Sequence, residues 1–78
     1  MKALFVEIKC ELGRAYEVAA AIADAEIASE IYSTAGAFDL LVKCYLEDHV
    51  DPGHFVTESI QRIDGIRDTR TIMTFRAF

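Results

Sequence analysis

The residues best suited to bind a polar small molecule lie at a turn, between Gly36 and Asp39. A glycine can adopt a positive φ and bring backbone N–H groups close to a ligand carboxylate. An aspartate is an acceptor for an ammonium group. A structural interpretation is also available, in which Gly36 serves the turn and Asp39 accepts hydrogen bonds from turn amides. We favour a binding role for Asp39 because an aspartate rarely opens an otherwise apolar strand.

Two other groups of residues have side chains capable of chemistry. His49 and His54 flank a predicted helix start, but a zinc site needs three or four convergent ligands. His54 and Asp51 resemble a general-base pair, with no Ser or Cys nucleophile placed beside them. The sequence contains neither a GxGxxG motif nor a P-loop. We therefore predict no metal, no cofactor and no catalytic residue.

The charge balance argues against nucleic acid as a direct partner. Eight Lys and Arg residues against thirteen Asp and Glu residues give a net charge of −5, and the cations are scattered. Phosphate binding needs clustered cations, and an anionic membrane surface also repels a negative chain. No apolar run approaches the roughly 20 residues of a transmembrane helix. Arg67 and Arg70 are interpreted as a solvated strand edge rather than an anion site.

Targeting and redox signals indicate the cytoplasm. The start of the chain, with one lysine and an apolar stretch interrupted by Glu7, does not form a signal peptide. The two cysteines, Cys10 and Cys44, form no CxxC motif or metal-binding spacing. We expect a reduced pair that acts as small apolar filler.

Hydrophobic periodicity predicts four strands and two helices in the order β-α-β-β-α-β. Alternation indicates strands, a helical period indicates helices, and Asp51-Pro52 and Asp64-Gly65 mark the expected start and end of the second helix. The expected elements are strand 3–10, helix 14–25, strand 26–34, strand 38–46, helix 52–64 and strand 66–78. This order predicts an α+β, ferredoxin-like fold in one domain spanning 1–78, with a four-stranded antiparallel sheet and two helices on one face.

The two faces of the sheet differ in their expected partners. Strands 3–10 and 38–46 should be central, with one apolar face each toward the helices, which places Cys10 and Cys44 on neighbouring parallel strands. The opposite face carries Phe5, Leu41 and Tyr45 with nothing to cover them. Such a patch typically marks a binding surface, and a chain of 78 residues buries little surface alone. We predict face-to-face dimerisation there; a tolerated amphipathic surface is the alternative.

Two short motifs resemble a known family. The first is Gly36-Ala37-Phe38-Asp39-Leu40-Leu41, and the second is Ile63-Asp64-Gly65-Ile66 followed by Thr69 and Thr71. Both resemble the effector-binding (RAM) domain of the Lrp/AsnC transcriptional regulators, over essentially the whole chain. Asp64 stands where that family often has proline.

The resemblance implies an assembly and a ligand. The family forms dimers through its sheets, and the dimers assemble into rings, here an octamer or decamer. Amino acids bind between dimers near the turn, which makes Gly36, Asp39, Thr69 and Thr71 the candidate ligand-binding residues. The threonines are also simply good strand formers. Full members carry an N-terminal helix-turn-helix domain; this chain resembles the stand-alone form, and we expect it to mix with full-length regulators.

Three functions remain open at this point. The first is an oligomeric amino-acid-binding module without enzymatic activity. The second is a small dimeric ferredoxin-like enzyme of the monooxygenase or cyclase type, which the apolar helix-facing side of the sheet disfavours. The third is a purely structural assembly protein.

Overall fold

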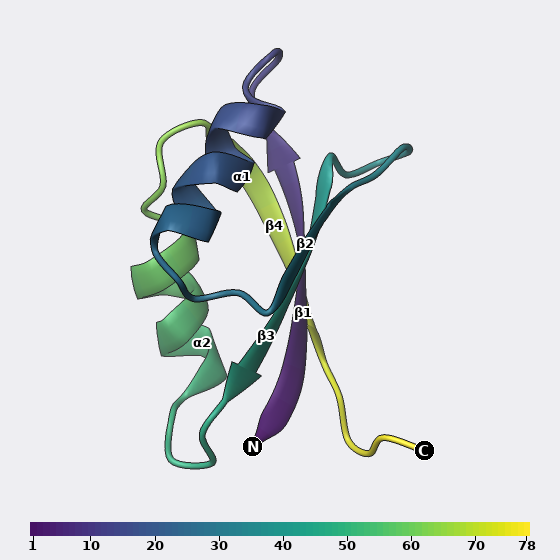
Figure 1. Cartoon of the computed structure of the whole chain (residues 1–78), viewed down its shortest axis with the longest axis vertical. Helices are drawn as coiled ribbons and strands as arrows, with labels where there is room; N and C mark the ends of the chain where they lie inside the picture. Colours follow the sequence, from purple (N-terminus) through teal and green to yellow (C-terminus); the bar gives the residue numbers. More distant parts are fainter.

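The chain forms one four-stranded sheet with its helices on one side (Figure 1). The computed structural model describes all residues 1–78. Its elements in chain order are β1 (Lys2–Cys10), α1 (Ala15–Asp24), β2 (Glu30–Ser33), β3 (Leu40–Leu46), α2 (Pro52–Phe55), the π-helical segment η1 (Val56–Ile60) that continues α2, and β4 (Ile66–Met73). The strand order is β2-β3-β1-β4, so the predicted ferredoxin-like fold is confirmed.

The two central strands supply most of the core. Burial alternates strictly along β1 and β3, as the sequence period of two predicts. Val18 and Ile22 of α1 and Val56 and Ile60 of η1 complete the core from the helix side. All buried side chains are apolar. The helices and the sheet are therefore joined by hydrophobic burial rather than by polar contacts.

The predicted direction of the central pair was wrong. β1 and β3 are antiparallel, with Leu4 opposite Cys44, while Cys10 lies opposite Ile66 of β4. The physical reason is the connection: α1 carries the chain back, which makes β2 parallel to β1, and the turn after β2 then reverses β3. Cys10 and Cys44 therefore share a buried face but lie toward opposite ends of the sheet.

Several predicted element ends were also displaced. The second helix begins as predicted, with Pro52 at its first position and the Asp51 carboxylate accepting a hydrogen bond from the His54 N–H (2.9 Å). It ends at Ile60, not at Asp64. β2 begins later than predicted because Glu26 adopts a positive φ of 56° after α1. β4 ends at Met73 rather than at 78.

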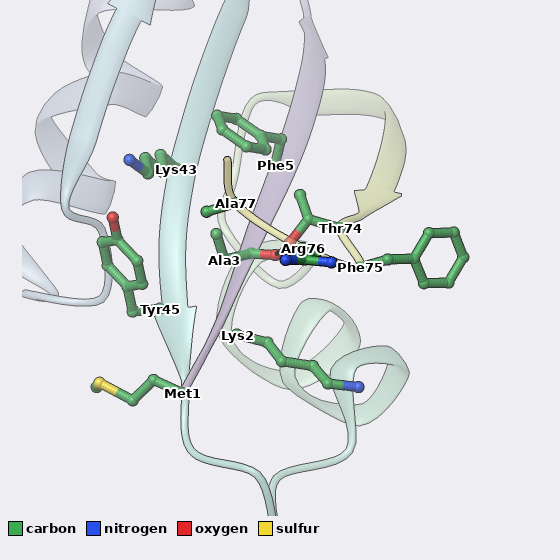
Figure 2. Close-up of a pocket in the computed structure, with 10 residues that line it drawn as sticks. All are labelled: Met1, Lys2, Ala3, Phe5, Lys43, Tyr45, Thr74, Phe75, Arg76 and Ala77. Carbon is green, nitrogen blue, oxygen red and sulfur yellow. Dashed lines mark hydrogen bonds between the residues drawn. The ribbon is translucent and has the colours of Figure 1, made fainter.

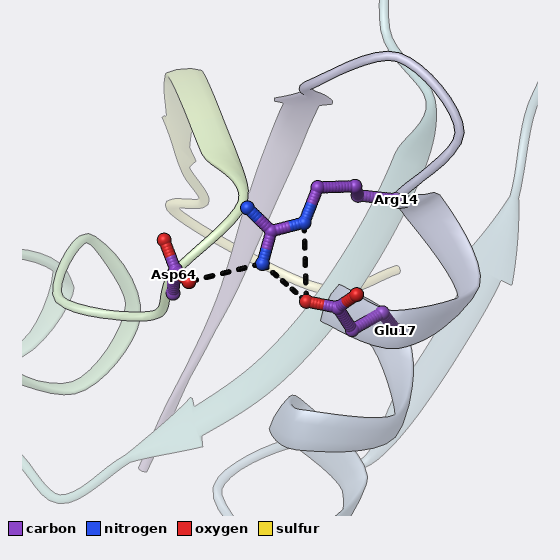
Figure 3. A network of polar contacts seen from close by, with 3 residues as sticks. All are labelled: Arg14, Glu17 and Asp64. Atoms are coloured by element: carbon purple, nitrogen blue, oxygen red, sulfur yellow. Dashed lines mark hydrogen bonds and ion pairs between the residues drawn. The ribbon is translucent and has the colours of Figure 1, made fainter.

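The turn before β4 is fixed by a polar contact with α1 (Figure 3). The Arg14 guanidinium pairs with Glu17 in its own helix and with Asp64, 3.0 Å away. Gly65 has a φ of +100°, and a Cβ there would lie 2.9 Å from Val18 and 3.2 Å from the Arg14 guanidinium. The glycine therefore lets the turn approach α1 closely.

No helix is long and apolar enough to cross a membrane.

Candidate functional site

The turn that links β2 to β3 is closed by two hydrogen bonds. The Thr34 N–H donates to the Asp39 carbonyl (2.9 Å), and the Thr34 hydroxyl donates to the Phe38 carbonyl (2.9 Å). Gly36, at the exposed tip, has a φ of +107°, with no atom within 4 Å of the position of a Cβ. A side chain would have room at this position, so the reason for a glycine is the positive φ of the backbone.

Asp39 joins this turn to the end of β1. Its N–H donates to the Ile8 carbonyl (2.8 Å), and its carboxylate accepts from the Cys10 N–H (2.7 Å). Burial, and next the nearby Asp39 carboxylate, raise the pKa of the Cys10 thiol. A carboxylate offers about four acceptor positions. The contact with Cys10 uses one of them, so Asp39 has a structural role and acceptor capacity for a ligand as well.

Thr69 and Thr71 belong to β4, which pairs with β1 on the side away from β3. They are opposite Ile8 and Val6, so their side chains project from the helix-facing side of β4. The Thr69 hydroxyl accepts a hydrogen bond from the Gln61 side chain (2.8 Å), whereas Thr71 is exposed. The structure thus brings Gly36 and Asp39 together in one turn and places both threonines across β1 from them.

A cluster beside the turn went unnoticed in the sequence. The Phe38 ring lies 5.3 Å from the Arg70 guanidinium, and the Arg70 Nε donates to the Glu7 carboxylate (2.7 Å). These residues come from the turn, β4 and β1, respectively. Arg70 therefore lies beside the turn, on the edge strand β4, and is paired with Glu7. The available signal was the alternation of β4, which puts Arg70 and Glu7 on one face.

The sheet face away from the helices carries a mixed apolar patch. Phe5 and Leu41 are half-buried, and Tyr45 is 47% exposed. Tyr32 and Ile72 extend the patch to the edge strands, because they lie opposite Leu41 and Phe5. We call these five residues the open-face patch: Phe5, Tyr32, Leu41, Tyr45 and Ile72. It crosses all four strands.

Lys43, Glu30 and Tyr32 on this face are paired with one another. Lys43 lies 3.3 Å from Glu30, and the Tyr32 hydroxyl donates to the same Glu30 carboxylate. The bond from Tyr32, followed by that from Lys43, lowers the pKa of Glu30. Hydrogen bonds with Tyr45 and Glu30 raise the pKa of Lys43. The face can therefore approach another surface without presenting an unpaired charge from this group.

These features define a class of protein: a small α+β module with a carboxylate-bearing turn at one end of an open sheet face. The family model described as the Lrp/AsnC ligand binding domain matches residues 3–78. The chain therefore belongs to the Lrp/AsnC ligand-binding (RAM) domain family, a family of ligand-binding regulatory modules.

Solved structures agree with this assignment. TTHA0845 from Thermus thermophilus has a TM-score of 0.89 and 32% identity, covering 100% of this chain and 98% of its own. FFRP-DM1 has a TM-score of 0.87 and 27% identity, covering 96% and 100%. E. coli AsnC has a TM-score of 0.76 and 24% identity, covering 97% of this chain but 52% of its own. No curated protein sequence matches the chain.

Proposed function

We propose that this chain binds a free amino acid at the turn formed by Gly36 and Asp39. The observation that carries the proposal is the Asp39 carboxylate, which belongs to the same turn as the positive-φ Gly36 and uses one acceptor position for the Cys10 N–H. The carboxylate suits an α-ammonium group, and the backbone N–H groups of the turn suit an α-carboxylate.

The remaining parts of this site come from a second dimer. Thr69 and Thr71 belong to β4, which is separated from the turn by β1, and they face the helix side of the sheet. Their hydroxyls therefore suit a ligand held between two copies rather than within one. The arrangement agrees with a homodimer built on Phe5, Leu41 and Tyr45 that assembles further into an octamer or decamer ring. A regulator from Neisseria meningitidis, 18% identical and with the same fold, is described as a complex with L-methionine.

The cellular role follows from the assembly. In this proposal the chain acts in the cytoplasm by forming mixed oligomers with full-length Lrp/AsnC regulators, and it needs no direct contact with DNA. Its net charge of −5 suits a protein partner better than nucleic acid. Co-purification of the tagged chain with such regulators from its own host tests this step, and clean failure with every one of them contradicts it.

Calorimetric titration with each free amino acid tests the ligand site. Asp39→Asn keeps an oxygen that can accept from the Cys10 N–H but removes the charge, so the fold is retained. We expect affinity for the ligand to fall about ten- to a hundredfold, because charge-assisted hydrogen bonds contribute ~1.5–3 kcal/mol.

The matched control is Asp24→Asn, which neutralises an exposed carboxylate at the end of α1, away from the turn. It should leave affinity within about twofold of wild type, since exposed charges contribute little. Equal affinity in wild type and Asp39→Asn, or an absence of binding by every amino acid, contradicts the proposal.

A further inference from the structure

The last residues of the chain leave the sheet on the side opposite the helices (Figure 1). We call residues 74–78 the C-terminal arm. The Thr74 hydroxyl donates to the Ala3 carbonyl (2.6 Å), which holds the start of the arm beside β1. The arm therefore begins at a fixed point and extends on the same side of the sheet as the open-face patch.

The C-terminal arm packs poorly against its own chain. Phe75 and Phe78 are 100% and 109% exposed, respectively. The Phe75 ring points away from Phe5 and Tyr45 (Figure 2). A hollow of about 350 Å³ lies between the arm and these two sheet residues. Exposed apolar groups that gather in this way typically mark a contact with another macromolecule.

A second copy of the chain is the partner that suits the arm. The proposed dimer places another sheet against the open face, which is the side to which the arm extends. Arg76 supplies the only charged side chain of the arm, and its guanidinium lies 5.3 Å from the Phe78 ring. A cationic segment is attracted to a copy whose net charge is −5. Arginine and aromatic residues are also the types enriched in protein interfaces.

We propose that the C-terminal arm packs on the partner subunit of the dimer and that Phe75 and Phe78 anchor it there. The proposal rests on the dimer of the proposed function and adds a contact that the open-face patch does not contain. Two-fold symmetry gives both subunits the same contact, so each dimer gains two arms. The arm is then part of the interface rather than a free chain end.

Photocrosslinking of the full chain tests where the arm lies. A chain with p-benzoylphenylalanine in place of Phe78 is mixed with isotope-labelled wild type, left to exchange subunits and irradiated. We expect covalent dimers in which the arm is joined to a labelled peptide, because the arm contacts another subunit. Mass spectrometry should assign that peptide to the strands rather than to α1, since the sheets face each other in the proposed dimer.

Removal of the two rings tests how much the arm contributes. Phe75→Ser and Phe78→Ser, combined in one chain, should raise the concentration at which the assembly dissociates by about ten- to a hundredfold, since aromatic anchors dominate interface energies. Light scattering at falling protein concentration measures this value. The matched control is Leu12→Ser, because Leu12 is 97% exposed but lies in the loop between β1 and α1. It should change the value by no more than about twofold.

The outcomes separate the arm from the dimer itself. Crosslinks confined to the arm's own chain, or equal dissociation in the double variant and Leu12→Ser, overturn the proposal. If wild type is then still an oligomer in light scattering, the dimer through the open-face patch stands without the arm. A wild type that is monomeric at every concentration overturns both.

Discussion

At the scale of single residues, the contact between Arg14 and the turn before β4 explains why this turn contains Asp64 and Gly65. Asp64 pairs with the Arg14 guanidinium, 3.0 Å away, which gives this position a use that proline lacks. Gly65, which has a positive φ, lies next to the same guanidinium. The two residues together set how β4 enters the sheet.

Gly65→Ala is expected to destabilise the fold by about 1–3 kcal/mol, because it forces a side chain into the positive-φ region. The new Cβ would also meet Val18 at 2.9 Å. Chemical denaturation measures the loss. Gly53→Ala is the control, because Gly53 is helical and a Cβ there would lie 3.7 Å from the Asp51 carboxylate, its nearest neighbour. This substitution should be neutral or should stabilise the fold by up to ~1 kcal/mol. Equal losses in both variants would refute this account.

The Arg14–Asp64 pair should give stability a defined pH dependence. The hydrogen bond from Arg14 lowers the pKa of Asp64 below its ordinary value of 3.8. A group whose pKa is lowered by folding stabilises the fold above its unfolded pKa, and that stabilisation is lost as pH falls through the folded pKa. We therefore expect wild type to melt at a higher temperature than Asp64→Asn at pH 6, and the two melting temperatures to converge once the pH falls below the lowered pKa of Asp64. A melting difference that persists in acid would contradict the assignment.

At the scale of elements, the antiparallel pairing of β1 and β3 separates the cysteines. Cys44 lies opposite Leu4, six residues before Cys10 along β1, which is about 20 Å at ~3.3 Å per residue. A disulfide needs Cα atoms within about 7 Å. Both thiols are buried, and burial raises the pKa of each.

We expect both cysteines to stay free when the purified protein is exposed to mild oxidant. A thiol reagent should react slowly with the folded chain. After unfolding, the reagent should modify two thiols per chain. If the chain is unfolded without reductant and no thiol then reacts, the two cysteines have formed an internal disulfide. That result would contradict the strand register.

The sequence was sufficient to predict the element order and the faces, but not the register. Alternation in β1 and β3 identifies the buried side chains because each strand has one apolar face. The placement of Thr69 and Thr71 on the helix-facing side depends on their pairing with Ile8 and Val6, next to an irregularity between Lys9 and Cys10. Cys10 lies 29 residues from Asp39, and Asp64 lies 50 residues from Arg14, so no local pattern could identify these two contacts.

At the scale of the whole molecule, the open face is the feature that a single chain leaves unexplained. Tyr32, Tyr45 and Ile72 remain 54%, 47% and 41% exposed on it, and Phe75 beyond β4 is fully exposed. A second copy can cover this surface, and a chain of this size gains much of its stability from such contacts.

Leu41→Glu should shift the protein to a smaller species in light scattering, because it places a carboxylate in the centre of the proposed interface beside Glu7, its partner across the strands. Tyr16→Glu is the control, since Tyr16 is 79% exposed on α1, on the other side of the sheet. Equal masses for wild type and Leu41→Glu would contradict dimerisation through this face.

The strand order also has a consequence for synthesis on the ribosome. β1 is made first, but both of its hydrogen-bonded neighbours, β3 and β4, come later, and β4 is the last element of the chain. One of its two edges therefore stays unpaired until residues 66–73 have left the exit tunnel. Until then the unpaired edge of β1 can pair with other chains, which makes it a natural target for a holdase chaperone.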